Sequence, residues 1–467
     1  MEAELTEFEI RGLHDRYNIR VPIEQNRCVL VGANGLGKTT IISILFYTLS
    51  RQWRRLLDFQ FDSVHITLAK EKITITRQDI ETGSISHLAL RRAARTLRMM
   101  SPSVAARLEN APEVFEELFQ AQSRQELERI ADNHRISPSL IERIVREMEP
   151  AAQEQLFKEA TPLRVAETVI RDRIKSQILY LPTYRRIEKD LKTILPDLDE
   201  HLRKHNEMRS ARKRESASHF VELVEFGMED VEGMLERRLG ALKEQAREKL
   251  NALAGNYLRD VIRGEATQYH SGSFGPMSSA AVERILSRVE ERTLSEADKR
   301  KLKDVIEQIR KSPEHKLSVQ EGYIAHFFAR LVEIHQSLAQ QEDAIEQFAR
   351  ICNKYLQGKR IVYDERSYRI AISTDGYPNI KFKDLSSGEK QIVSLFSHIY
   401  LSEVESMFVI VDEPELSLSV EWQKALLPDI SHSRRCRFLL AVTHSPFVFD
   451  NALDSYTRDL GELIEAA

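Results

Sequence analysis

Residues 385–391 read L-S-S-G-E-K-Q, and further along the chain residues 408–415 read F-V-I-V-D-E-P-E. The four apolar residues that open the second segment predict a buried strand, which ends in the paired carboxylates Asp412 and Glu413. The first segment predicts a Ser/Gly turn that opens an apolar helix, and the free backbone N–H groups of such a turn attract an anion. Together the two segments predict an α/β protein with an anion site and a carboxylate-bearing strand end.

A second phosphate-binding pattern lies far upstream, where residues 32–39 read G-A-N-G-L-G-K-T. A short apolar strand at residues 28–31 runs into it, and an apolar run of helical length follows it. Strand, G-x-x-x-x-G-K-T and helix are together the context that a P-loop needs. In such a loop the backbone N–H groups surround the β-phosphate, the Lys neutralises the β- and γ-phosphate oxygens, and the Thr reaches Mg²⁺. The expected nucleotide-binding residues are Gly32, Asn34, Gly35, Gly37, Lys38, Thr39 and Thr40.

The order of these patterns resembles the ABC-type ATPases: a P-loop, a Ser-Gly turn, a D-E strand end and a later T-H pair at residues 443–444. The resemblance is to the branch that holds the SMC proteins, the double-strand-break-repair ATPases and the OLD family. It implies an α/β fold, an ABC-type P-loop ATPase head with a mixed central sheet and an N-terminal antiparallel lobe, plus large all-helical insertions. It also implies ATP and Mg²⁺ as cofactors and hydrolysis of ATP to ADP and phosphate.

In that family each nucleotide lies between the P-loop of one subunit and the Ser-Gly turn of another. The resemblance therefore implies a homo-oligomer, at least a dimer, because a single subunit would have incomplete sites. The turn residues that would cap the γ-phosphate are Ser386, Ser387, Gly388 and Glu389.

The resemblance also assigns the residues at the two strand ends. Asp412, together with Thr39, would hold Mg²⁺, and Glu413 would polarise the attacking water. His444 would be the switch histidine that touches the γ-phosphate. The relatives carry a Gln at the end of another strand, where this chain has Thr183 and Tyr184. Two arginines at 185–186 are candidates to serve the phosphates or a neighbouring subunit.

Changes in composition divide the chain into five expected segments, which follow in chain order. They are residues 1–89, the N-terminal lobe with the P-loop; 90–175, a helical insertion; 176–190, a Q-loop-like strand of the head; 191–355, a second helical insertion or lever; and 356–467, the C-terminal lobe with the signature turn, Walker B strand, D-loop and switch histidine.

The bulk composition limits the functional class. The chain has 467 residues with 68 Lys and Arg against 72 Asp and Glu, a net charge of −4 that does not favour a strongly basic nucleic-acid binder. Basic clusters at 91–98 and 203–214 are either solvated surfaces or contacts for nucleic acid or an acidic partner. The three cysteines make no metal-type spacing, and neither a signal peptide nor a membrane span is expected. These features favour a cytoplasmic protein with no membrane partner.

OLD proteins follow the ATPase with a Toprim nuclease domain, and this chain ends too soon after His444 for one. We therefore expect a separate effector, a Toprim-type nuclease or toxin, from the same operon. Compact ATPases of this kind resemble the ATPase subunits of bacterial anti-phage defence systems such as PARIS, with Septu and retron-associated ATPases as competitors. DNA or a phage protein is the candidate trigger.

Two other classes stay open. One is an SMC-like DNA-repair or chromosome-associated ATPase that binds DNA, for which steep salt dependence of DNA binding would be diagnostic. The other is a scaffold whose ATP sites set assembly and hardly turn over.

Overall fold

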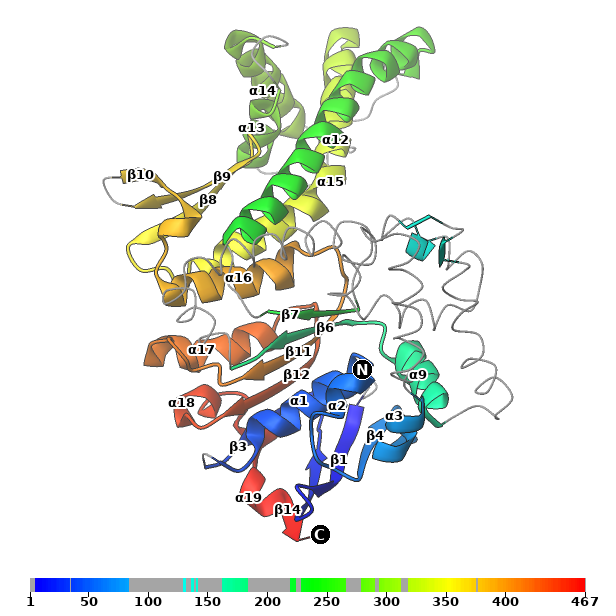
Figure 1. Cartoon of the computed structure of the whole chain (residues 1–467). Coiled ribbons are helices and arrows are strands. Elements are labelled where there is room, and N and C mark those ends of the chain that lie inside the picture. The colour runs from blue at the N-terminus through cyan, green and yellow to red at the C-terminus, as the bar shows by residue number, and fades with distance from the viewer. Residues whose placement is uncertain are drawn as a thin grey trace. The chain divides into compact units, whose positions relative to one another are not determined.

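The computed structural model describes residues 5–33, 35–83, 129–131, 136–137, 140–141, 162–183, 219–223, 228–265, 279–289, 294–311, 318–374 and 377–466. The chain falls into two compact units, Met1–Glu225 with Glu403–Ala467, and Phe226–Ser402 (Figure 1). The predictions made for Asn34, for residues 184–186 and for the basic clusters at 91–98 and 203–214 lie outside the described residues.

The first unit contains a six-stranded sheet in the order β13-β3-β12-β11-β6-β7. Its strands are β3 (Arg27–Val31), β6 (Gln177–Leu181), β7 (Phe220–Glu222), β11 (Met407–Asp412), β12 (Cys436–Thr443) and β13 (Thr457–Asp459). Every pairing between these neighbours is parallel, so within the described residues the central sheet is parallel and not mixed as expected. The physical reason is that β6, β11 and β12 are near-continuous apolar runs, which suit parallel strands covered by helices on both faces.

Helices cover this sheet on its two sides, with α1 on one and α17 on the other (Figure 1). The helices of this part are α1 (Lys38–Leu49), α2 (Trp53–Leu56), α17 (Val420–Ser431), α18 (Pro446–Phe449) and α19 (Leu460–Leu463), with a short 3-10 helix η4 (Asp454–Tyr456). Nearly all residues of α1 are buried, because it lies between the parallel sheet and a second, antiparallel one.

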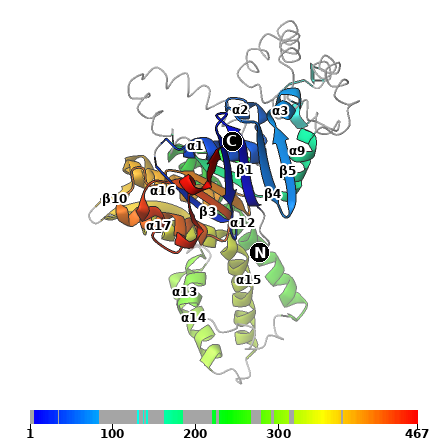
Figure 2. The ribbon, with the colours of Figure 1, turned by 90° about the horizontal axis from the view of Figure 1, so that it is seen from below.

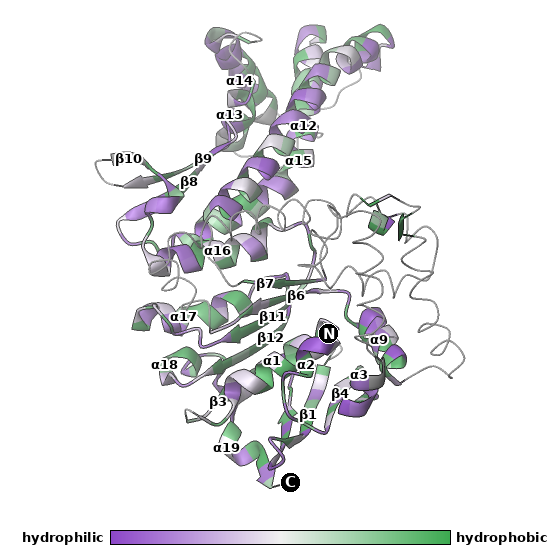
Figure 3. Cartoon of the chain, in the orientation of Figure 1, coloured by the Kyte–Doolittle hydropathy of each residue, from purple (hydrophilic) through white to green (hydrophobic). Residues whose placement is uncertain are grey.

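The antiparallel sheet has the order β14-β2-β1-β4-β5 (Figure 2). Its strands are β1 (Leu5–Leu13), β2 (Tyr17–Pro22), β4 (Ser63–Leu68), β5 (Glu71–Thr76) and β14 (Ile464–Ala466), and it is accompanied by α3 (Arg77–Gly83) and α9 (Pro162–Arg173). The expected antiparallel lobe is therefore present, with β4 and β5 as its hairpin. Phe8 and Ile10 of β1 are buried, while Glu7 and Glu9, which alternate with them, are partly exposed, a pattern typical of a sheet with one solvated face (Figure 3).

The second unit is mainly helical. Its elements are α12 (Met228–Ile262), α13 (Ser279–Ser287), α14 (Glu296–Lys311), α15 (Val319–Cys352), β8 (Lys359–Asp364), β9 (Arg369–Thr374), β10 (Tyr377–Ile380), η3 (Phe382–Asp384) and α16 (Ser387–Leu401). The longest of these helices, α12, has 35 residues and lies within the segment 191–355 that was expected to be helical. The three strands form an antiparallel sheet in the order β10-β9-β8.

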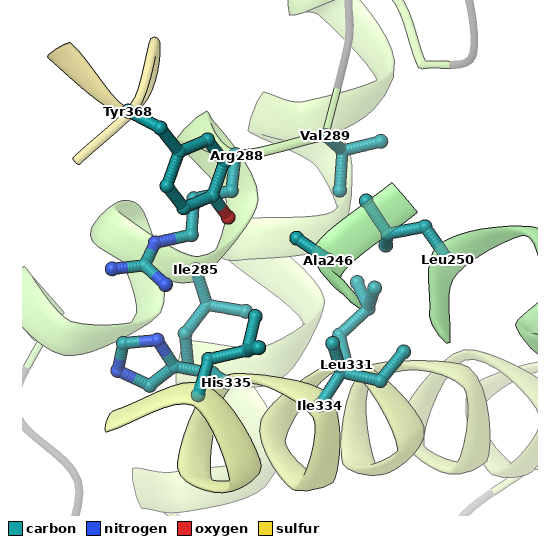
Figure 4. A pocket seen from close by; sticks show the side chains of 10 residues that line it. Ala246, Leu250, Ile285, Arg288, Val289, Leu331, Ile334, His335 and Tyr368 are labelled. Carbon is teal, nitrogen blue, oxygen red and sulfur yellow. The ribbon is translucent and has the colours of Figure 1, made fainter. Parts of the chain in front are cut away.

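A small cavity lies between α12, α13 and α15 (Figure 4). Its apolar walls include Leu250 and Leu331, and Arg288, His335 and Tyr368 also line it. Arg288 reaches the carboxylates of Glu342 at 2.8 Å and Glu365 at 2.9 Å, so its buried charge is compensated beside the apolar wall.

The Ser386 turn and α16 belong to the second unit, together with the long helices, whereas the strand that ends in Asp412 belongs to the first. The division into five segments stays a prediction. Among the described residues, no helix is both long and apolar enough to cross a membrane.

Candidate functional site

The carboxyl ends of four neighbouring strands meet at one edge of the parallel sheet. The register pairs Val31 of β3 with Thr443 of β12, and the next pairings bring the end of β11 at Asp412 and the end of β6 at Leu181 to the same edge. In open α/β sheets this edge is where ligands bind. The P-loop and the segments that carry Glu413, His444 and Thr183 all leave the sheet here.

Two glycines give the P-loop its shape. Gly35 has φ 87° and Gly37 has φ 80°, both in the left-handed region, where other residues are strained. Gly37 is also the N-cap of α1, so the helix begins directly after the loop. The N-terminus of a twelve-residue helix therefore directly follows the loop that leaves β3, the position that a phosphate site requires.

Lys38 lies across this loop. Its side chain is buried, and its Nζ donates hydrogen bonds to the carbonyl oxygens of Gly32 and Ala33, each at 2.9 Å. These carbonyls hold the ammonium group above the loop, where phosphate oxygens would replace them as acceptors. Thr39 is exposed and Thr40 partly exposed at the start of α1.

Asp412 is fully buried at the end of β11. Beside it, the Tyr180 hydroxyl of β6 lies 3.2 Å from the Ser43 hydroxyl of α1. The pKa of Tyr180 is raised, first by burial and further by the negative charge of Asp412. The hydrogen bond joins α1 to the sheet, so the P-loop helix and the Asp412 carboxylate are held in one framework.

Glu413 has an unusual backbone. Its φ of 48° is in the left-handed region, and its N–H donates to the carbonyl oxygen of Val442 at 2.8 Å. Such a conformation costs a non-glycine residue on the order of 1–3 kcal/mol, and strain of this kind concentrates at functional sites. The Glu413 side chain is 21% exposed, and its Oε1 lies 3.9 Å from the His444 ring Nδ1.

His444 is held by a carboxylate that the sequence analysis did not nominate. Glu415 Oε1 accepts the backbone N–H of His444 at 3.0 Å and lies 3.0 Å from its ring Nδ1, whereas Glu413 is 3.9 Å from the same nitrogen. The Glu415 side chain is only 6% exposed, while that of His444 is 46% exposed. The ring is therefore anchored on one side and open on the other. The signal available in the sequence was the E-P-E spacing, which places a second acid two residues after Glu413.

Thr183 follows β6 at the same edge, in the place where the resembled ATPases carry Gln. Its hydroxyl oxygen is buried and makes no hydrogen bond within the part of the chain that the structure describes.

The Ser386 turn is a complete helix cap within the second unit. The Ser386 side chain accepts from the Glu389 backbone N–H, and the Glu389 side chain accepts from the Ser386 N–H at 2.7 Å. Ser386 and Ser387 are exposed, but Glu389 is only 5% exposed and pairs with Lys359. Glu389 therefore shapes the turn rather than facing outward from it.

These residues fit a nucleotide with Mg²⁺. Across the described ranges there is no group of three or more His, Cys, Asp or Glu residues that would hold a metal by itself. A carboxylate and a hydroxyl are instead a donor set that Mg²⁺ accepts when phosphates complete its coordination. Asp412 at the end of β11 and Thr39 at the start of α1 would supply such oxygens.

Comparison with known proteins agrees with this chemistry. A family model described as "AAA domain, putative AbiEii toxin, Type IV TA system" matches residues 107–450, most of the chain. The chain belongs to this AAA domain family. The matched range includes the Ser386 turn, the carboxylates at 412–415 and His444, whereas the P-loop lies before it. Membership in an AAA family implies an ATPase domain that uses a nucleotide, typically with Mg²⁺.

Two further comparisons are less informative about the AAA domain. A similar solved structure is the Smc head domain with an extended coiled coil bound to the C-terminal domain of ScpA, derived from Pyrococcus furiosus. It is 13% identical, covers 99% of this chain and 96% of that chain, and gives a TM-score of 0.33, too low to support an argument. Comparison with curated proteins gives no match.

Proposed function

We propose that this AAA domain hydrolyses ATP in an assembly of at least two copies and regulates a separate effector protein in anti-phage defence. The observation that carries the ATPase part is the convergence at one sheet edge of Lys38, Asp412, Glu413 and the anchored ring of His444. The Nζ of Lys38 already donates hydrogen bonds to two carbonyl oxygens of the P-loop. Asp412 and Glu413 lie at the end of strand β11.

Each side chain has a distinct role in this proposal. Lys38 exchanges its carbonyl acceptors for the β- and γ-phosphate oxygens of the substrate. Glu413, placed by its left-handed backbone, orients and accepts a proton from the attacking water. Asp412 and Thr39 would hold Mg²⁺, whose charge would offset that of the phosphates.

His444 and the Ser386 turn complete the site. Glu415 anchors the Nδ1 side of His444, so the opposite edge of the ring is presented to the γ-phosphate. The turn provides exposed serines and the N-terminus of α16, which would cap the γ-phosphate bound by another copy. This arrangement makes ATP the link between copies and hydrolysis the event that releases them.

The defence role rests on the resemblance of the motif order and the compact architecture to the ATPase subunits of anti-phage systems. The family description refers to a putative toxin and to a type IV TA system, and it names neither a phage nor a separate effector. A nuclease or toxin from the same operon is the effector we propose, with DNA or a phage protein as the trigger.

The ATPase proposal is tested with three purified variants. Lys38→Ala should lose nucleotide binding, and Glu413→Gln should bind ATP but hydrolyse it on the order of 10²–10⁴-fold more slowly, because the base is lost. Ser386→Arg should bind ATP as a single subunit and fail to assemble or hydrolyse. Fast hydrolysis by Glu413→Gln would overturn the assignment of the base.

The effector proposal is tested by affinity purification of Glu413→Gln from its native operon, followed by native mass measurement and mass spectrometry. A stoichiometric nuclease-like or toxin-like neighbour supports the defence role. An assembly that instead carries DNA, with steep salt dependence, contradicts it and favours an SMC-like repair ATPase.

A further inference from the structure

The N-terminal end of α16 is tied to the strand that follows the long helix α15. Lys359, the first residue of β8, places its Nζ 2.7 Å from Glu389 Oε2, and the same oxygen accepts the Ser386 N–H at 2.7 Å. The carboxylate is almost completely buried, whereas the Lys359 side chain is 24% exposed, so water competes for the pair only from the side of the lysine. Burial by itself would raise the pKa of Glu389, but the hydrogen bonds from Lys359 and Ser386 outweigh it and lower the pKa.

The strand β8 is in turn fixed to the end of α15. The C-cap residue of α15, Asn353, accepts the Ile361 N–H at 2.7 Å and donates to the Ile361 carbonyl oxygen at 2.8 Å. Because both backbone groups of Ile361 are used, the strand cannot shift along the helix end without breaking two hydrogen bonds. Lys359 lies two residues away on the same strand.

Two further contacts connect α16 to the long helices. Tyr355, just beyond α15, packs against Phe396 of α16 with ring centroids 5.7 Å apart. At the other end of α16, the guanidinium of Arg238 on α12 donates to the carbonyl oxygens of Leu401 and Ser402. Hence α16 is attached to α12 and α15 at both ends and in its middle, and a movement of those helices displaces it as well.

From these contacts we propose that Lys359 is a positioning residue for the Ser386 turn, and that Asn353, Lys359 and Glu389 couple α15 to that turn. The long helices thereby regulate ATP hydrolysis: a partner that moves α15 changes how the turn meets the nucleotide of another copy. This inference rests on the proposed function, since it gives the turn a role in hydrolysis.

The test compares Lys359→Met with Lys359→Arg and with Arg360→Met, which removes the exposed cation next to it in β8. Lys359→Met should lower kcat on the order of ten- to a hundredfold, because a small misplacement of a group that contacts the reacting phosphate has effects of this size. Binding of a fluorescent ATP analogue by the single subunit should stay unchanged, while the melting temperature falls because the buried Glu389 carboxylate loses its cation. Lys359→Arg should keep most of the activity, and Arg360→Met should equal the wild type.

Asn353→Ala provides a second, independent break in the same connection and should also lower kcat while nucleotide binding persists. Wild-type turnover by both Lys359→Met and Asn353→Ala would overturn the coupling. Loss of nucleotide binding in parallel with turnover would show a merely structural role and would overturn it too. Ser386→Arg distinguishes failure of the proposed function from failure of the coupling. If this variant hydrolyses ATP normally, the proposed role of the turn is wrong. If it is inactive while Lys359→Met hydrolyses ATP normally, only the coupling is wrong.

Discussion

His444 and Glu415 are joined twice through one carboxylate oxygen, since Glu415 Oε1 accepts the backbone N–H of His444 and also lies 3.0 Å from its ring Nδ1. The first contact fixes the end of β12 against the segment after β11, and the second fixes the ring. A carboxylate at Nδ1 favours the proton on that nitrogen and determines the direction of the other ring nitrogen. Glu415, which follows β11, thus orients the side chain of His444, which follows β12.

The first prediction concerns this pair. Glu415→Ala should lower kcat on the order of ten- to a hundredfold, because His444 loses its orientation. Glu415→Gln retains an acceptor oxygen for both contacts and should lose less. Steady-state kinetics of both variants check this, with Glu405→Ala, an exposed acid of the same unit, as the control. If Glu415→Ala turns over like the control, Glu415 does not act through His444.

The second prediction concerns the cavity of the helical unit (Figure 4). Leu331 is 3% exposed and lines the cavity, so Leu331→Ala should destabilise this unit by about 2–5 kcal/mol. Val319 on the same helix is 66% exposed, and Val319→Ala should change stability by less than about 0.5 kcal/mol. Urea unfolding followed by helical circular dichroism measures both. Equal midpoints for the two variants would contradict the core position of Leu331.

Much of the first unit follows from local sequence. The apolar runs at residues 28–31, 177–181, 408–411 and 438–443 each fall in a strand, and the run after Lys38 forms α1. These elements are predictable because a buried strand or helix next to a phosphate-binding loop leaves a continuous apolar pattern. The parallel order of the sheet could not be predicted from local sequence, because strand direction depends on which neighbours pair.

Other features depend on contacts between distant residues. Glu415 was visible as part of E-P-E, but its link to His444 spans 29 residues and exists only because β11 and β12 are in register. The pair of Lys359 and Glu389 spans 30 residues in the same way. The strand β14 has only three residues, too few for an alternating pattern, and it joins the N-terminal sheet by pairing with β2.

The third prediction concerns the three cysteines, all of which are buried. Burial raises the pKa of Cys28 to about 12 and that of Cys436 to about 11, and it also raises the pKa of Cys352. Because the thiolate is the reactive form, these thiols should not react with a thiol reagent in the folded protein near neutral pH. Titration with Ellman's reagent should label none of the three before urea is added and all of them afterwards. Rapid labelling of the folded protein would contradict their burial.

The fourth prediction concerns acid stability and His219, a partly buried residue of the first unit. Burial, and then the positive charge of Arg51, lower the pKa of His219 from 6.5 to about 4, against an opposing hydrogen bond to the Leu49 backbone. As the pH falls below 6.5 the unfolded chain binds a proton here that the folded chain does not bind until about pH 4. The contribution to stability is therefore complete above pH 6.5 and is lost progressively toward pH 4.

His219→Gln cannot bind this proton, so its free energy of unfolding should fall less steeply over that interval than the wild-type value. The difference in slope should be at most about 1.4 kcal/mol per pH unit, and smaller because solvent reaches part of the ring. Urea unfolding at several pH values between 7.5 and 4.5 measures it, with His432→Gln, an exposed histidine of the same unit, as the control. Parallel stability curves for wild type and His219→Gln would mean that His219 takes up its proton equally in the folded and unfolded chain, and that other buried groups cause the acid sensitivity.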